Sequence, residues 1–273
     1  MIEFGPDANG NVKPIRRFFP FGAAFVYGED ATGNFWSFLT RFSDAAKPLG
    51  SVKPFRWVPG TVGAFATDFR QNFYVAQWPG SGFGKPPRTL EIDEFPVNRY
   101  GKIPPLRRLI VDPRRGLIHQ LAIDGAGNVY ALGGSSFLGS QIAEYPAGQN
   151  GRVAPSRILD LPKGYAFFSD VKADAAGNAY ALAQGPPKAS AVLEYGAAGH
   201  DYRTVLSVRT IFPFAVNAAG DLFAVVQWPN WRSRQCVEQI VELAHATNRR
   251  VLAIRGTRTV ICRHRAASIT VPP

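Results

Sequence analysis

The sequence predicts an all-β fold in which one four-stranded unit is repeated along the chain. The clearest copy spans residues 121–159, where the apolar stretches LAID, NVYAL, QIAEY and PSRIL are separated by a tight turn and two polar loops. The turn recurs at intervals of roughly 40 to 55 residues, which with four short strands per repeat is typical of a β-propeller. We therefore predict a single β-propeller domain over residues 1–273.

The recurring turn has the pattern Asp-x-x-Gly-Asn, and its aspartate and glycine each have a physical role. The aspartate can accept hydrogen bonds from the backbone N–H groups that follow it, and the glycine can adopt the positive φ of a short hairpin loop. We expect these aspartates to cap their turns and not to form a shared carboxylate site. The copies lie at Asp30–Asn34, Asp68–Asn72, Asp124–Asn128, Asp174–Asn178, Asn217–Asp221 and, in degenerate form, His264–Ser268.

Five full repeats are predicted from the apolar stretches around these turns. Their expected strands are, in order, 23–28, 34–39, 40–43 and 54–58; 63–68, 72–77, 90–95 and 106–111; 121–124, 128–132, 141–145 and 155–159; 170–174, 178–183, 191–195 and 204–208; 213–217, 221–226, 238–243 and 250–254. Between the second and third strands we expect long loops at 77–89 and 227–236.

The two ends of the chain each carry half a repeat. Residues 2–4 and 14–18 match third and fourth strands, and residues 259–263 and 268–271 match first and second strands. Joining them would complete a sixth blade and remove exposed sheet edges. We therefore predict a closed six-bladed ring; the alternative is an incomplete ring from a longer parent chain.

Composition and charge limit the classes of function. The 273 residues carry a net charge of +11, which favours acidic partners. No apolar run approaches the length of a membrane helix, and the start lacks the features of a secretory signal. We expect a monomer that stays in the cytoplasm as given, or is extracellular or periplasmic if the chain is a mature form or fragment.

A family resemblance rests on the recurrent pattern apolar-Asp-x-x-Gly-Asn-apolar-Tyr-Ala, followed by Glu-Tyr, Gly and Pro-x-Arg-x-Ile. This pattern resembles the NHL-repeat and gluconolactonase-like six-bladed propellers over nearly the whole chain. The resemblance implies the fold, but it leaves the function open because such propellers serve as enzymes, binding modules and scaffolds.

The resemblance also implies a place for an enzymatic site, at the central channel lined by the innermost strands. The channel candidates are Glu29, His119, Gln120, Asp170 and Lys172. Gluconolactonase-like members bind a divalent metal through oxygen ligands there, whereas Lys172 would repel a cation. A streptogramin-lyase-like activity would need a histidine such as His119. No ligand motif of the metal-binding family can be matched residue by residue, and a lone histidine is more often structural. No cofactor and no catalysis is therefore our first expectation.

Arginines recur on the predicted fourth strands, among them Arg56, Arg107, Arg157 and Arg203. They are compatible with a basic belt for nucleic acid, or with charged outer edges that prevent association between sheets. Their even spacing over the repeats favours the second interpretation.

The loops between second and third strands combine aromatic residues with hydrogen-bond donors, a combination that suits ligand binding. We therefore predict a non-enzymatic binding module for a small molecule, a glycan or a protein, with an anionic ligand favoured. The alternative is that the tryptophans cap the core between sheets. The predicted binding residues are Trp78, Lys188, Trp228, Trp231, Arg232 and Arg234.

Overall fold

A computed structural model describes the backbone of a large part of the chain. The described residues are 2–3, 16–17, 28–29, 35–37, 40–42, 48–54, 62–70, 72–78, 89–96, 101–112, 116–134, 141–185, 189–208, 211–230, 235–245 and 251–261. All regular structure among them is β-strand, so the all-β prediction is confirmed. No helix in this part of the chain is long and apolar enough to cross a membrane.

The chain divides into two compact units, which we describe separately. The first comprises Met1 and Phe18–Asp160, and the second comprises Ile2–Arg17 and Leu161–Pro273. The single-domain interpretation stays a prediction.

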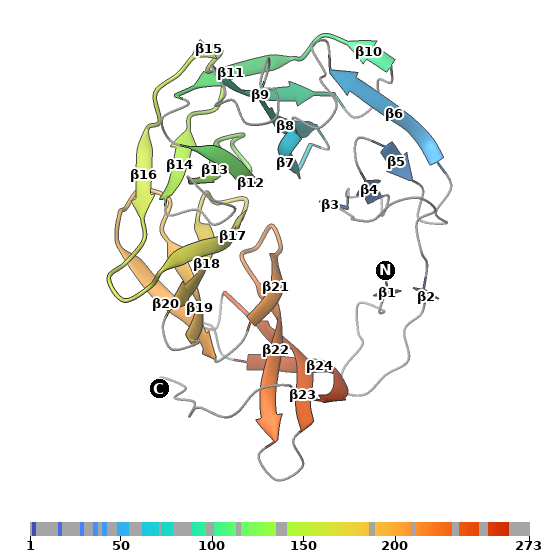
Figure 1. Ribbon diagram of the computed structural model, residues 1–273, viewed down its shortest axis with the longest axis vertical. Helices are drawn as coiled ribbons and strands as arrows, with labels where there is room; N and C mark the ends of the chain where they lie inside the picture. Colours follow the sequence, from blue (N-terminus) through green and yellow to red (C-terminus); the bar gives the residue numbers. More distant parts are fainter. Residues whose placement is uncertain are drawn as a thin grey trace. The chain divides into compact units, whose positions relative to one another are not determined.

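The first unit contains three sheets, each named here after its repeat (Figure 1). The first-repeat sheet has β3 (Gly28–Glu29), β4 (Phe35–Ser37), β5 (Thr40–Phe42), β6 (Pro48–Pro54) and β10 (Gly101–Ile103). The second-repeat sheet has β7 (Val62–Thr67), β8 (Phe73–Gln77), β9 (Leu90–Phe95), β11 (Arg107–Val111) and β15 (Gly151–Arg152). The third-repeat sheet has β12 (Leu117–Ile123), β13 (Val129–Gly134), β14 (Gln141–Tyr145) and β16 (Arg157–Asp160).

The second unit contains two four-stranded sheets and one strand pair. The fourth-repeat sheet has β17 (Phe167–Ala173), β18 (Ala179–Gly185), β19 (Ala189–Tyr195) and β20 (Tyr202–Val208). The fifth-repeat sheet has β21 (Ile211–Val216), β22 (Leu222–Asn230), β23 (Gln235–Leu243) and β24 (Val251–Ile261). Strands β1 (Ile2–Glu3) and β2 (Arg16–Arg17) pair with each other.

Each repeat is an antiparallel meander, so consecutive strands pair as the sequence predicts. The tight turns join first to second strands, and their glycines have positive φ: 91° at Gly127, 89° at Gly177 and 85° at Gly220. This region of φ is strained for residues with a Cβ, which explains why glycine recurs at that place.

Two sheets gain a fifth strand from the repeat that follows them. β10 lies between β9 and β11 in the chain but pairs in parallel with β6, the outermost strand of the first-repeat sheet. β15 lies between β14 and β16 and pairs in parallel with β11, the outermost strand of the second-repeat sheet. The added strands cover edges that would otherwise leave backbone N–H and C=O groups unpaired.

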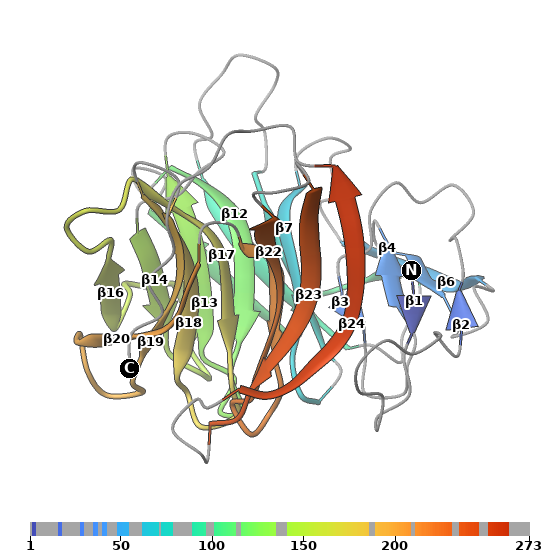
Figure 2. The same cartoon turned by 90° about the horizontal axis from the view of Figure 1, so that it is seen from below.

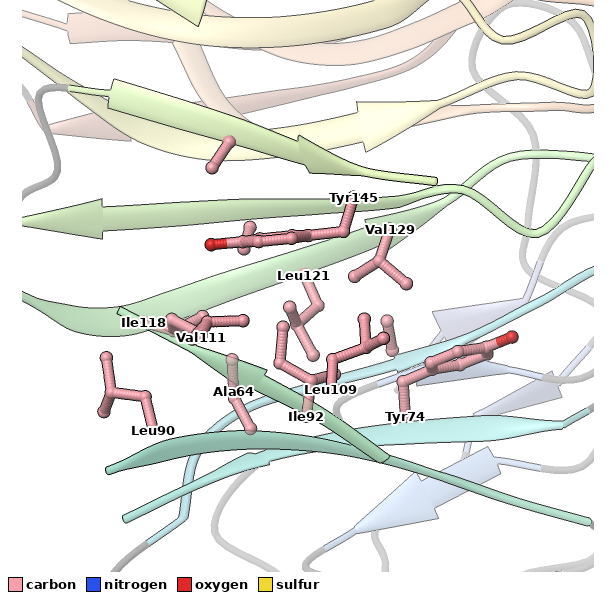
Figure 3. Packing of buried hydrophobic residues seen from close by; sticks show 14 of the residues in the cluster. Ala64, Tyr74, Leu90, Ile92, Leu109, Val111, Ile118, Leu121, Val129 and Tyr145 are labelled. Carbon is pink, nitrogen blue, oxygen red and sulfur yellow. The ribbon is translucent and has the colours of Figure 1, made fainter. Parts of the chain in front are cut away.

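The core of the first unit lies between the second- and third-repeat sheets. Figure 3 shows Ala64, Leu109 and Ile92 of one sheet facing Leu121 and Val129 of the other, and these side chains belong to one buried cluster. Such alternation of inward side chains with outward ones follows from the period of two in a β-strand. Burial of this apolar surface is the main force that holds the two sheets together.

Close approach of the innermost strands depends on Gly63. A Cβ at this position would overlap the carbonyl oxygen of Ile118 on β12 and the indole ring of Trp78. The pairing of β7 with β8 is irregular at the same place, between Val62 and Ala64. Gly63 therefore allows β7 and β12 to lie side by side.

Several predicted strand limits are wrong. The fourth strand of the first repeat lies at Pro48–Pro54, ahead of the predicted 54–58. The expected loop at 227–236 is largely a hairpin, because β22 continues to Asn230 and β23 begins at Gln235. β24 continues through Ile261, so residues 259–261 pair with β23 and are not a separate first strand (Figure 2).

Candidate functional site

The aspartates of the tight turns are bound within their own repeats. In the fourth repeat, Oδ1 of Asp174 accepts hydrogen bonds from the backbone N–H groups of Ala176 (3.0 Å) and Asn178 (2.9 Å). Its Oδ2 accepts from the side-chain amide of Asn178 (2.7 Å) and from the hydroxyl of Tyr180 (2.9 Å). Asp124 and Asp68 make the same four kinds of bond. The capping role is thus confirmed for these residues, while Asp30 lies outside the described ones.

A glutamate–arginine pair extends this network in each of three repeats. Arg107 Nε lies 2.9 Å from Glu94, and Arg203 Nη2 lies 2.8 Å from Glu194. Arg157 pairs with Glu144 in the third repeat. Arg107 and Arg157 are buried, with exposed fractions of 9% and 8%. The prediction that fourth-strand arginines form a charged outer edge is therefore wrong for these two residues, since their charges are neutralised inside the fold.

Burial also changes the acidity of the tyrosines in the network. Burial, together with the carboxylate of Glu94, raises the pKa of the Tyr74 phenol well above its ordinary value. Burial and the carboxylate of Glu144 do the same to the pKa of Tyr130. Both phenols therefore stay protonated and can donate to the turn aspartates up to high pH.

A pocket of about 160 Å³ lies between the turns of the second and third repeats. Its walls come from Asp68–Arg70 and Asn72, the turn 124–127, Ala147 and Gly148, and the Glu94–Arg107 pair. Arg107 also donates to the hydroxyl of Tyr74 and to the carbonyl oxygens of Gly127 and Pro146. The pocket thus has a hydrogen-bonded polar floor and lies inside one compact unit.

The turn beside this pocket departs from the repeat. It carries Phe69 and Arg70, where the corresponding turns carry Gly125 and Ala126, two alanines at 175–176, or two alanines at 218–219. Phe69 is 43% exposed, and Arg70 is exposed as well. Because three other turns form without an aromatic and a basic side chain, folding does not require this pair. The departure is visible in the sequence, although the capping pattern alone does not point to a site.

The channel candidates are only partly brought together. Glu29 is placed by its backbone on β3. His119 and Gln120 are half-buried neighbours on β12, where the pairing with β13 is irregular. Asp170 is engaged by Lys172, whose Nζ lies 2.7 Å from Oδ1, and the ammonium of Lys172 also lies over the ring of Phe214. Among the described residues no group of three histidine, cysteine or carboxylate side chains could hold a metal ion.

The predicted loop-face residues lie in different settings. Trp78 is half-buried at the end of β8 and packs against the core cluster between the second- and third-repeat sheets. Trp228 belongs to β22, with its backbone opposite Val237. Lys188, Trp231, Arg232 and Arg234 lie outside the described residues. For Trp78, the packing agrees with the alternative role of capping the core.

A buried charged cluster in the second-repeat sheet escaped sequence analysis. Asp93, with no exposed surface, accepts from both Nε (2.6 Å) and Nη2 (2.8 Å) of Arg108, and from the amide of Gln77 (2.6 Å). The hydrogen bonds from Arg108 to Asp93 raise the pKa of the guanidinium. Glu91 lies 3.3 Å from the same guanidinium. The signal was the polar residues Glu91 and Asp93 at positions where the fourth repeat has Ala191 and Leu193.

Comparison with known proteins gives structural likenesses only. No family model and no curated protein matches the sequence, whereas 136 chains of solved structures match. One is the beta-propeller domain of Cps50 (Swd1) from Myceliophteria thermophila, at 7% identity and a TM-score of 0.46, covering 84% of this chain and 66% of that domain. This chain thus spans about two thirds of that domain.

Two further solved structures are similar at the same level. The major allergen Mala s 1 of Malassezia sympodialis has 11% identity and a TM-score of 0.44, covering 86% of this chain and 73% of that one. The periplasmic gluconolactonase PpgL of Pseudomonas aeruginosa has 13% identity and a TM-score of 0.41, covering 85% and 82%. At these values none of the three carries an argument about what this chain does.

Proposed function

We propose that the chain is a closed six-bladed, NHL-like β-propeller that acts without catalysis as a binding module, and that the β22–β23 hairpin presents its main binding surface. The observation that carries this proposal is the length of the hairpin. β22 and β23 have 9 residues each, whereas the corresponding strands of the second, third and fourth repeats have 5 to 7. The extra residues extend the hairpin by roughly 7 to 13 Å, at about 3.3 Å per residue.

The extension falls on the side of the loop and not on the side of the tight turn. Pairing starts with Leu222 opposite Leu243, directly after the turn, and runs to Asn230 opposite Gln235. The four residues between that last pair are, by sequence, Trp231, Arg232, Ser233 and Arg234. A hairpin of this length with tryptophan and arginine at its end would combine stacking area with charged hydrogen-bond donors. This chemistry suits an anionic ligand, in keeping with the net charge of +11.

The non-catalytic role is supported by the hydrogen bonds and ion pairs that the ionisable side chains make within the protein. The turn aspartates, the glutamate–arginine pairs and the Asp170–Lys172 pair are bound to one another inside the repeats. A catalytic acid or base must instead be free to reach a substrate proton. The same engagement weighs against the alternative of a metal-dependent lactonase, because it occupies Asp170, one of the two carboxylates among the channel candidates.

Binding can be tested with sulfated and carboxylated oligosaccharides and an acidic peptide as probes. Trp228→Ala with Arg232→Ala should abolish binding of at least one probe in calorimetry, while the melting temperature stays nearly unchanged. Tyr202→Ala is the control that should leave binding unchanged, because it removes an exposed aromatic side chain from the fourth-repeat sheet. Loss of stability in the hairpin variant would assign these side chains to the core, and lactone turnover that a chelator abolishes would favour the enzymatic alternative.

Ring closure is supported by the membership of the second unit, in which Ile2–Arg17 group with Leu161–Pro273. Closure by the chain ends predicts that deletion of residues 1–17 unfolds the protein, because it would expose sheet edges at the C-terminal end. A cooperative thermal transition within a few degrees of that of the intact chain would contradict closure. The binding proposal would stand in that case, since it does not depend on the chain ends.

A further inference from the structure

The pocket between the second- and third-repeat turns is independent of the hairpin and has features of a ligand site. Its volume is about 160 Å³. Cavities of about 150 Å³ admit one benzene molecule, so the pocket has room for a single six-membered ring or about five water molecules. Its lining is mixed, with carboxylates and guanidinium groups beside the aromatic ring of Phe69.

Unused hydrogen-bonding positions remain on the floor of this pocket. The Arg107 guanidinium has five N–H donors, of which four reach Glu94, Tyr74, Gly127 and Pro146. Glu94 accepts from Asn72 and Arg107 and interacts with the Tyr74 hydroxyl, although a carboxylate has about four acceptor positions. Within the described residues one N–H donor of Arg107 and one acceptor position of Glu94 are therefore left unused, and both residues line the pocket. A ligand hydroxyl, which donates and accepts at once, matches this arrangement.

The charges around the pocket select against an anion. Asp68, Glu94 and Asp124 contribute three negative charges, whereas Arg70 and Arg107 contribute two positive ones. The one excess negative charge, close to a partly buried site, opposes a carboxylate or phosphate. A neutral polyhydroxylated ring avoids this repulsion, although the chain as a whole is basic.

The rim of the pocket supplies the remaining contacts. Phe69 offers an exposed aromatic face against which the C–H face of a ring can pack. Arg70 has no ion pair among the described residues, and its guanidinium can donate to hydroxyl oxygens. The small residues Gly125, Ala126 and Gly148 leave the opposite wall open to close approach. Departures from a repeat that folding does not require are expected at functional sites.

We propose that this pocket binds the ring of a neutral saccharide, with Phe69 stacked on the ring, Arg70 at its rim, and the Glu94–Arg107 pair holding one hydroxyl. The site is distinct from the β22–β23 hairpin and does not require that the hairpin binds anything. The ring can be a free sugar or the terminal residue of a glycan, since both present the same hydroxyls.

The test uses methyl glycosides of glucose, galactose and mannose as probes in ligand-observed NMR with the full chain. At least one should bind, and Phe69→Ala with Arg70→Ala should weaken that binding about tenfold or more, because both the stacking face and the rim donor are lost. This variant has the Ala-Ala sequence of the turn at 217–221, so its melting temperature should match that of the wild type. Tyr202→Ala, which removes an exposed aromatic side chain from the fourth-repeat sheet, is the control that should bind as the wild type does.

Three results would overturn the proposal: no binding of any methyl glycoside, equal binding by the Phe69/Arg70 variant, or tighter binding of methyl glucuronide than of methyl glucoside. Phe69→Trp adds a second check that does not remove a side chain, since a larger face should strengthen binding. Trisaccharides ending in the preferred residue distinguish the source. Binding equal to that of the methyl glycoside indicates a glycan end, and binding of the methyl glycoside alone indicates a free sugar.

Discussion

The second- and fourth-repeat sheets share a strand order and a turn network, yet they differ in some of the side chains that they bury. In the second repeat, the buried Gln77, Glu91 and Asp93 form a charged cluster with the half-buried Arg108. In the fourth repeat the positions of the first three are taken by Ala183, Ala191 and Leu193, all fully buried. The same meander thus forms with two chemically different interiors.

This difference indicates what the repeat requires. The turn aspartate, the tyrosine two positions into the second strand, and the glutamate of the third strand are present in both sheets. The buried positions that differ between the two sheets can be polar or apolar, provided that buried polar groups find hydrogen-bond partners. The fifth repeat forms its meander with Asn217 and Phe223 at the places of the aspartate and the tyrosine, so the full network is not essential to the strand order. We infer that the network stabilises the repeats that have it, and the following predictions test that inference.

The largest effect is expected from the turn network itself. Asp174→Ala should lower the free energy of unfolding by about 3 to 5 kcal/mol, because it leaves two backbone N–H groups, an amide and a phenol without an acceptor. Urea denaturation measures this loss. Asp174→Asn keeps one acceptor oxygen and should lose clearly less; equal losses would show that the network does not hold the turn.

A smaller loss is expected from the charged cluster of the second repeat. Asp93→Ala should cost about 3 kcal/mol, because it leaves a cavity in the sheet and deprives the half-buried Arg108 of its bidentate partner. Replacement of the whole cluster by Gln77→Ala, Glu91→Ala, Asp93→Leu and Arg108→Ile should restore stability to within about 1 kcal/mol of the wild type. If the variant with all four substitutions is less stable than Asp93→Ala alone, the second-repeat sheet needs its charged cluster. The apolar residues of the fourth repeat could then not replace it.

The contribution of the buried tyrosines Tyr74 and Tyr130 to stability can be measured through its dependence on alkaline pH. The raised pKa values of Tyr74 and Tyr130 mean that, above about pH 10, the unfolded chain releases phenol protons that the folded chain retains. The free energy of unfolding should therefore be unaffected below that pH and fall above it, by at most about 1.4 kcal/mol per pH unit for each tyrosine. Tyr130→Phe should make the decline shallower in denaturation curves taken between pH 9 and 11, and an unchanged slope would contradict the burial of this phenol.

The smallest effect concerns Lys172, which stands where the second and third repeats have Ala66 and Ala122. Lys172→Ala should change the free energy of unfolding by less than about 1 kcal/mol, since its pair with Asp170 is partly exposed and screened by solvent. Thermal denaturation at low and high salt measures the change. A loss well above about 1 kcal/mol would contradict this expectation. It would show that the Asp170–Lys172 pair stabilises the fourth repeat, although the second and third repeats fold with alanine at this position.

The strands that sequence analysis predicted best are those with the clearest alternation and the closest turn signals. The third strands at 90–95 and 141–145 agree with β9 and β14. The fourth strand of the first repeat was misplaced, because an aromatic stretch after Pro54 resembled a strand more than the residues that pair with β5. The β22–β23 hairpin was missed because Pro229 suggested a loop, whereas a strand tolerates proline where the N–H is not needed.

The candidate pocket was predictable only in part. The departure of Phe69 and Arg70 from the repeat is visible in the sequence, yet its meaning depends on the cavity beside it. The burial of Arg107 depends on three-dimensional proximity, because its partners include Gly127 and Pro146 of the next repeat. Spacing along one chain does not show such contacts, and a surface arginine and a buried one look alike in sequence.

The parallel pairing of β15 with β11 has a consequence for synthesis on the ribosome. The four strands of the second repeat are complete when Val111 has emerged, but the outer edge of that sheet stays open until Gly151 and Arg152 follow. The interval lasts on the order of a few seconds at ordinary translation rates. During that time the nascent chain exposes a strand edge to its neighbours on the polysome, and a chain terminated between these points would keep that edge permanently.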